Sequence, residues 1–203
     1  MALISSCDAI IFDYGGVLVR HQTDEDQARM AELAGIPKDV FTELYWSQRL
    51  DYDKDLVSCR EYWARIACTA KRSFGEETID QLVELDTTSW MQFDEVMWEW
   101  IDQLRAAGKR LAMLSNMPRE LGEALKSRTQ RLSSFDQVTL SYELRSAKPE
   151  PAIYEHCLEG LGTPAEQTLF LDDRIANVQG AELFGMQAVQ FTSRDDTLLL
   201  LRS

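Results

Sequence analysis

The regular alternation of helical and strand-like segments from Phe93 onward limits the fold more than any other feature. Short apolar runs, typical of strands buried on both faces, alternate here with stretches whose apolar residues recur at helical spacing. With the apolar run before Asp13, the predicted strands are residues 9–12, 110–114, 137–141, 168–171 and 187–191. This pattern predicts an α/β fold, a Rossmann-like parallel sheet with helices on both faces.

Residues 20–90 differ in the spacing of their apolar residues, which is helical and includes no convincing strand. Val40, Phe41 and Leu44 share one helical face. Residues 58–61 fit a capping box that would begin another helix. Three or four short helices are therefore predicted to interrupt the chain after its first strand. We divide the chain into a core, residues 1–18 and 91–203, and an all-helical insert, residues 19–90.

The charge balance restricts the partners of the chain. Its 203 residues include 21 Lys and Arg against 34 Asp and Glu, which gives a net charge of −13. Such a charge disfavours nucleic acid and anionic membrane surfaces as partners. An anionic substrate would have to be attracted by local cations or by a metal ion.

Cysteine usage and hydropathy indicate a cytoplasmic protein. We expect it to be a monomer or a homodimer. The four cysteines are scattered without metal-ligand spacing, as expected of reduced residues: Cys7, Cys59, Cys68 and Cys157. Residues 1–6 lack a basic region and a long apolar stretch, so no signal peptide is expected. No run approaches the ~20 apolar residues that a membrane-spanning helix needs.

Asp13 directly follows the first predicted strand, and Gly15 and Gly16 come next. A carboxylate at the carboxyl end of a buried strand is placed like a nucleophile or a metal ligand, and the glycines let the backbone approach a ligand. The alternative is a turn in which Asp and Gly serve only the backbone geometry.

Polar residues also follow or accompany later strands. Ser115 and Asn116 end one apolar run, Lys148 precedes a proline and a helical stretch, and Asp172 and Asp173 end another run. Ligand-binding residues of a parallel sheet gather at such strand ends. Helix capping is the alternative for the Ser–Asn and Asp–Asp pairs, and a solvated surface position is the alternative for the lysine.

In this order, an Asp nucleophile, a hydroxyl, a lysine and an acidic pair resemble the four signature motifs of the haloacid-dehalogenase superfamily. The segments 13–17, Asp-Tyr-Gly-Gly-Val, and 172–177, Asp-Asp-Arg-Ile-Ala-Asn, are similar to those of its phosphatase-like members. That group includes a bacterial glucose-1-phosphate phosphatase. The resemblance spans nearly the whole chain, and the helical insert corresponds to the cap that closes over the strand ends in this family.

The resemblance implies a Mg²⁺-dependent hydrolase of small phosphorylated metabolites, sugar phosphates among them. Asp13 would form an aspartyl-phosphate intermediate, and Lys148 would offset the charge of nucleophile and phosphate. Ser115 and Asn116 would hold phosphate oxygens, and Gly15 would let the backbone approach the phosphoryl group.

The resemblance also implies the ligands of the Mg²⁺ ion. Asp13, the backbone carbonyl of Gly15 and Asp173 would bind it directly, and Asp172 would contact it through water or from behind these ligands. Asn177, where many relatives carry another Asp, would hold the geometry of the loop.

Gly15 departs from the pattern of most phosphatases in the superfamily, which carry there a second Asp that protonates the leaving oxygen. General acid–base catalysis is typically worth about 10² to 10⁴ in rate. His21 is the nearest imidazole in the sequence and could substitute, but no partner that would orient it is visible, which favours an exposed histidine at the entrance to the insert.

Two other functions therefore remain open. One is a catalytically weak or silent scaffold that binds phosphate or a phosphosugar. The other is a 2-haloacid dehalogenase, which needs no metal. Dehalogenases usually carry Tyr at the position of Gly15 and lack the pair at 172–173, and crowded carboxylates would repel a haloacid.

The insert is expected to select the substrate. Aromatic residues and a cation cluster where one of its helices ends, at Tyr45, Trp46, Arg49 and Tyr52. Arg49 could recognise a carboxylate or hydroxyl groups of the substrate. Aromatic residues at helical spacing are also typical of a hydrophobic core, which is the alternative.

Overall fold

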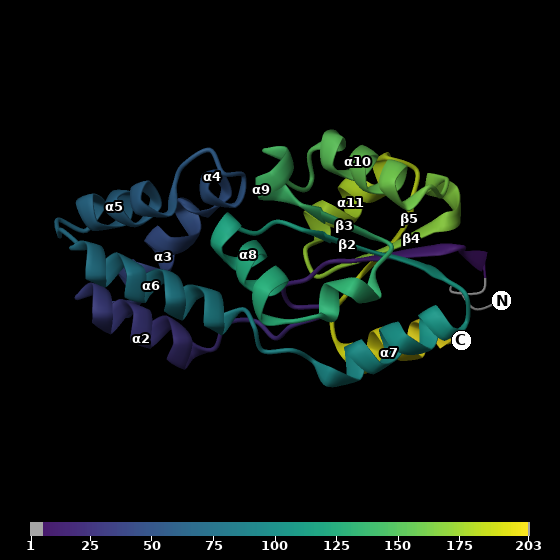
Figure 1. Ribbon diagram of the computed structural model, residues 1–203, viewed down its shortest axis with the longest axis horizontal. Coiled ribbons are helices and arrows are strands. Elements are labelled where there is room, and N and C mark those ends of the chain that lie inside the picture. Colours follow the sequence, from purple (N-terminus) through teal and green to yellow (C-terminus); the bar gives the residue numbers. More distant parts are fainter. Residues whose placement is uncertain (1–5, 203) are drawn as a thin grey trace.

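A five-stranded parallel sheet forms the centre of the protein (Figure 1). The computed structural model describes residues 6–202, so the N-terminal segment 1–5, in which no signal peptide was expected, lies outside the described residues. The strands follow the order β3-β2-β1-β4-β5 and are β1 (Ala9–Phe12), β2 (Arg110–Ser115), β3 (Gln137–Leu140), β4 (Thr168–Asp172) and β5 (Gln187–Gln190). The predicted strands are confirmed, with ends that differ by no more than one residue.

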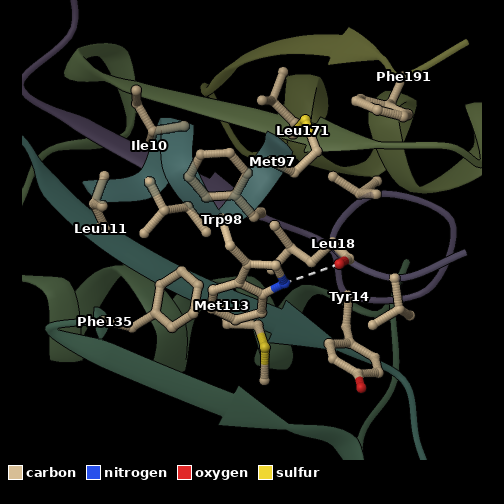
Figure 2. Packing of buried hydrophobic residues seen from close by; sticks show 14 of the residues in the cluster. Ile10, Tyr14, Leu18, Met97, Trp98, Leu111, Met113, Phe135, Leu171 and Phe191 are labelled. Atoms are coloured by element: carbon tan, nitrogen blue, oxygen red, sulfur yellow. Dashed lines mark hydrogen bonds between the residues drawn. The ribbon is translucent and has the colours of Figure 1, made fainter. Parts of the chain in front are cut away.

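The three central strands β1, β2 and β4 are buried on both faces, as their apolar runs predicted, whereas the edge strands β3 and β5 are partly exposed. Ile10 and Phe12 of β1 pack toward α7 (Glu95–Ala106), and Figure 2 shows Ile10 in this cluster with Trp98 of α7. The alternate residue Ile11 packs toward the opposite layer of helices. Successive side chains of a strand point to opposite faces, so one short apolar run supplies both sides of the core.

The opposite layer consists of α10 (Pro151–Leu161) and α11 (Ile175–Leu183), which contact β2–β3 and β4–β5 respectively. The remaining elements of the core are α8 (Arg119–Arg128), η1 (Arg131–Ser134), α9 (Ser141–Leu144), η2 (Ala165–Gln167) and α12 (Arg194–Arg202). Within residues 6–202, none of the helices has the length and apolar character needed to cross a membrane.

The segment between β1 and α7 is helical, as predicted, and lies to one side of the sheet (Figure 1). It contains five helices instead of three or four: α2 (Asp24–Ala34), α3 (Lys38–Ser47), α4 (Arg49–Asp53), α5 (Cys59–Thr69) and α6 (Glu76–Ser89). These helices enclose a hydrophobic cluster of their own, which includes Phe41, Trp63 and Leu82. The division into core and cap agrees with this packing and stays a prediction.

Local sequence signals explain how individual helices of the insert begin. The predicted capping box is present at α5, where Ser58 accepts from the backbone of Glu61 and the Glu61 carboxylate accepts from the backbone of Ser58. The predicted apolar face of α3 was partly wrong. Phe41 is fully buried, but Val40 is exposed, because the face that meets the other helices is narrower than the spacing indicated.

The two segments that connect the insert to the core lie side by side. The backbone of Arg20 donates to the carbonyl of Gln92 at 2.9 Å, and that of Asp94 donates to the carbonyl of Leu18 at 3.0 Å. Figure 2 shows that the indole nitrogen of Trp98 also donates to the Leu18 carbonyl, at 3.0 Å. The insert therefore leaves and re-enters the core at one place, close to the loop that follows Asp13.

Candidate active site

The sheet brings the predicted site residues together. β1 lies between β2 and β4, so the carboxyl ends of these three strands are neighbours. Asp13 follows β1, Ser115 ends β2 and Asp172 ends β4. The backbone of Asp13 donates to the carbonyl of Leu171 at 2.8 Å, which fixes the start of its loop.

Lys148 lies between two of these carboxylates. Its side-chain nitrogen is 2.7 Å from Oδ1 of Asp13 and 2.6 Å from Oδ2 of Asp172, and it donates to the carbonyl of Leu114 at 2.8 Å. Only 3% of Lys148 is exposed, so the surface interpretation of this lysine is wrong. Burial lowers the pKa of Lys148, but attraction to both carboxylates outweighs this effect and raises the pKa, so the ammonium stays charged.

The carboxyl group of Asp13 is held in an environment that disfavours its charge. Burial raises the pKa of Asp13 to about 7, the neighbouring Asp172 adds to the shift, and Lys148 opposes it. The backbone nitrogen of Tyr14 donates to Oδ1 of Asp13 at 2.6 Å. A further cation beside Asp13 would favour the ionised form that a nucleophile needs.

The donor set at this point fits Mg²⁺. Oxygen atoms of Asp13, Asp172 and Asp173 lie within 4.8 Å of one another, and carboxylate oxygens are ligands that Mg²⁺ prefers. Of Asp172 and Asp173, Asp172 accepts more hydrogen bonds. Its donors are the Lys148 ammonium, the backbone of Arg174 at 2.8 Å and the Asn177 amide at 3.0 Å. This arrangement favours Asp173 as the direct ligand.

Ser115 and Asn116 lie in the same cavity wall but differ in their contacts. The amide of Asn116 exchanges two hydrogen bonds with the backbone of Lys148, at 2.8 and 3.0 Å, so it positions the lysine. In the part of the chain that the structure describes, the Ser115 hydroxyl has no hydrogen-bond partner. It is therefore available to a ligand, while substrate contact by Asn116 stays a prediction.

Gly15 is backed by a residue that the sequence did not point to. A Cβ atom placed on Gly15 would lie 3.2 Å from the ring of Trp90, closer than ordinary van der Waals contact. The hydroxyl of Tyr14 donates to the Trp90 carbonyl at 2.7 Å and holds this part of the chain against the loop. An indole ring therefore occupies the space into which a side chain at position 15 would extend.

His21 has the partner that the sequence did not reveal. Its Nε2 lies 3.3 Å from Oδ2 of Asp173, and its ring meets that of Trp90 edge-on. The hydrogen bond to Asp173 raises the pKa of His21. With 62% of its side chain exposed, His21 is accessible as expected, but it is also oriented toward the site.

Arg49 lies in the cavity wall, but its guanidinium group is engaged within the insert. Its Nε is 2.7 Å from Asp53 and its Nη1 is 2.8 Å from Asp86, and Tyr45 completes the network. Tyr45 and Tyr52 are buried, as in the core alternative, whereas Trp46 is half-exposed. A role for Arg49 in contacting substrate therefore stays a prediction.

A cavity of about 580 Å³ joins the strand ends to the insert. Asp13, Gly15, Ser115, Lys148 and Asp173 line it from the core. Exposed Arg174 lines it as well and has no ion pair among residues 6–202. A cavity of this size accommodates a small-molecule substrate.

The sequence pattern of the haloacid dehalogenase-like hydrolases matches residues 7–185. The chain belongs to this family. Phosphatase MT3486 of Mycobacterium tuberculosis is 25% identical to it over 187 residues, 90% of this chain and 86% of that protein. The (S)-2-haloacid dehalogenase 4A of Burkholderia cepacia is 23% identical over 197 residues, 93% of this chain and 84% of that protein.

A solved structure supports the fold of this hydrolase. A haloacid dehalogenase family enzyme from Bacteroides thetaiotaomicron, in complex with magnesium and inorganic phosphate, has a TM-score of 0.71 to this chain at 20% identity. The match covers 91% of this chain and 93% of that one. The Rossmann-like fold inferred from the sequence is thereby confirmed. Since both phosphatases and dehalogenases are among the relatives, the family alone does not select the reaction.

Proposed function

We propose that this hydrolase cleaves phosphate monoesters of small metabolites with the help of Mg²⁺. The observation that carries the proposal is the grouping of Asp13, Asp172 and Asp173 around one point beside the buried cation Lys148. Three carboxylates would repel the carboxylate of a haloacid, whereas with Mg²⁺ they form a site for a phosphate group.

In the proposed reaction, a carboxylate oxygen of Asp13 attacks phosphorus and the bond to the ester oxygen breaks. The leaving oxygen takes up a proton from solvent and departs as an alcohol, and the water that attacks in the second step returns a proton to solvent. Water then attacks the aspartyl phosphate, which releases inorganic phosphate and restores the carboxylate of Asp13. The ammonium group of Lys148 offsets the negative charge of the nucleophile and of the phosphoryl oxygens in both steps.

Several contacts support this assignment of roles. Mg²⁺, when bound by Asp13 and Asp173, would supply positive charge to the phosphoryl oxygens. The free hydroxyl of Ser115 and the exposed guanidinium of Arg174 are suited to the remaining oxygens. Arg174 is also the kind of local cation that a chain of net charge −13 needs to attract an anion.

Phosphate release from a panel of phosphate esters and acyl phosphates, with Mg²⁺ and with a chelator, tests the proposal. We expect release from p-nitrophenyl phosphate and acetyl phosphate that requires Mg²⁺ and falls to background in Asp13→Asn. The matched control is Asp8→Asn, because Asp8 is exposed at the opposite end of β1. Arg174→Ala should raise KM more than it lowers kcat.

The same assay separates the alternatives. Halide release from 2-chloropropionate without Mg²⁺ would establish a dehalogenase instead. Binding of phosphate without turnover of any ester would establish a silent scaffold. Activity that persists in carefully purified Asp13→Asn would exclude the covalent mechanism.

A further inference from the structure

The cavity changes character from the sheet toward the insert. Its inner end is built from carboxylates, the Lys148 ammonium and the Ser115 hydroxyl. Its outer wall is built mainly from apolar side chains, which come from α3, α4, the end of α6 and the start of α8: Trp46, Leu50, Trp90, Met117 and Leu121. Whatever is esterified to the phosphate must extend along this wall.

Two indole rings lie one after the other between the loop that follows Asp13 and the outer end of the cavity. Trp90 lies against Gly15, and the ring of Trp46 meets that of Trp90 edge-on with centroids 6.3 Å apart. Exposure increases along the same path, since Trp90 is almost buried, whereas Trp46 is 48% exposed and Leu50 53% exposed. Apolar surface that lines a cavity and remains exposed gains free energy when an apolar ligand covers it.

The polar groups of the insert that could bind sugar hydroxyls are already engaged. Of those that line the cavity, Arg49 is paired with Asp53 and Asp86, and His21 is paired with Asp173. The exposed Arg174 of the core is assigned to the phosphate. A sugar or polyol placed against the remaining wall would leave hydroxyl groups without partners, which is costly on desolvation.

We propose that the alcohol part of the substrate is apolar, an aliphatic or aromatic group instead of a sugar or polyol. The indole rings of Trp46 and Trp90 and the side chain of Leu50 contact this group. The inference rests on the proposed function for the position of the phosphoryl group at Asp13. It narrows the substrate class to phosphate monoesters of apolar alcohols.

Alkylphosphonates test this inference without turnover, because their carbon–phosphorus bond is not hydrolysed by this reaction. Calorimetry with Mg²⁺ should show about fourfold tighter binding for each methylene added from ethyl to hexyl. n-Butylphosphonate should bind at least tenfold more tightly than 3,4-dihydroxybutylphosphonate, which has the same carbon chain. Equal or tighter binding of the dihydroxy compound would overturn the inference.

A pair of variants in the insert tests whether the apolar wall of the cavity causes the dependence of binding on chain length. Leu50→Ala should flatten the dependence on chain length, so that its loss of affinity is larger for hexylphosphonate than for ethylphosphonate. Leu56→Ala is the matched control, because Leu56 is 50% exposed in the same region but does not line the cavity. Equal effects of the two substitutions would also overturn the inference.

Hydrolysis of the corresponding esters separates this inference from the proposed function. Release of phosphate from n-butyl phosphate in preference to 3,4-dihydroxybutyl phosphate supports both. The reverse preference overturns the inference and leaves the phosphatase function in place. If neither ester nor any other is hydrolysed while the chain-length effect on binding persists, the function is refuted and the apolar site stands.

Discussion

The side-chain nitrogen of Lys148 lies 2.7 Å from Oδ1 of Asp13, although the two residues come from distant parts of the chain. Both side chains are almost fully buried, and the same nitrogen reaches Asp172. One cation thus holds together the ends of two neighbouring strands. Loss of the cation that offsets charge for the reaction would therefore also destabilise the fold, because it would leave both carboxylates buried and unpaired.

Lys148→Met is expected to lower the free energy of unfolding by about 3 to 5 kcal/mol, because it leaves buried carboxylates without their cation. The loss should be larger at pH 8 than at pH 5, since protonation of Asp13 relieves the unpaired charge. Urea denaturation at both pH values measures this. Lys126→Met is the control, because Lys126 forms ion pairs only in a partly exposed setting and should cost about 1 kcal/mol or less.

Lys148→Met should also weaken inhibition by phosphate and vanadate. This inhibition is measured under conditions in which urea denaturation shows that the variant is folded. Lys148 would have no part in either role if the inhibition constants stayed within twofold of those of the wild type and the free energy of unfolding were unchanged.

Asp13→Asn should change how stability depends on pH. The pKa of Asp13 is raised to about 7 in the folded protein, above the value of 3.8 for the free group, so ionisation of Asp13 opposes folding. Its stabilising contribution is present below pH 4 and is lost as the pH rises to about 7. Without Mg²⁺, Asp13→Asn should therefore gain stability relative to the wild type between pH 4 and pH 8, on the order of 2 to 4 kcal/mol.

Urea denaturation across this pH range measures the difference. Asp8→Asn serves as the control and should run parallel to the wild type, because Asp8 is exposed. A parallel curve for Asp13→Asn would show that Asp13 is not held in a disfavoured charge state.

Mg²⁺ should raise the melting temperature of the wild type by several degrees at concentrations well above its dissociation constant. The reason is that its carboxylate ligands are brought together only in the folded protein. Asp173→Asn should need at least tenfold more Mg²⁺ for the same shift. Thermal unfolding at graded Mg²⁺ concentrations measures this, with Asp102→Asn as control because Asp102 is exposed on α7. An unchanged response of Asp173→Asn would place the metal elsewhere.

The rate should depend steeply on the pKa of the leaving group, because Gly15 offers no side chain that could protonate it. Aryl and acyl phosphates should react faster than alkyl phosphates. Gly15→Asp should flatten this dependence only if Trp90 yields by a few tenths of an ångström, since the new Cβ atom would lie 3.2 Å from its ring.

Steady-state rates over a series of phosphates with graded leaving-group pKa measure the dependence. His21→Ala and His156→Ala form a matched pair, because the chain has two histidines and only His21 lines the cavity. A shallow dependence in the wild type that becomes steep in His21→Ala alone would show that His21 supplies the proton.

Sequence reasoning located the strands and the ends of the strands well, because both depend on local signals. Apolar runs mark buried strands. Parallel pairing places residues such as Asp13 and Asp172 at the carboxyl-terminal edge of the sheet, independently of how the loops are folded. The insert was recognisable by the absence of such runs. The predicted number of its helices was too low, because short helices such as α4 depend on tertiary packing more than on propensity.

Contacts between residues far apart in the sequence could not be predicted. Nothing near Trp90 indicates that its ring lies against Gly15, and nothing near His21 indicates Asp173. Arg49 was expected to be available to substrate, because its partner Asp86 lies in another helix and could not be predicted. Burial of Lys148 could not be predicted from local sequence, since a single lysine is usually a surface residue and only the motif order pointed to the site.

The junction between Arg20 and Gln92 has a consequence for how this protein can evolve. Since the helical insert begins and ends at neighbouring points, its length and shape can change without moving β1 or altering the strand order. Mutations that exchange one apolar wall for another need not disturb the carboxylates at the sheet edge. New substrates can thus be acquired through one stretch of the gene while the reaction is inherited through the other.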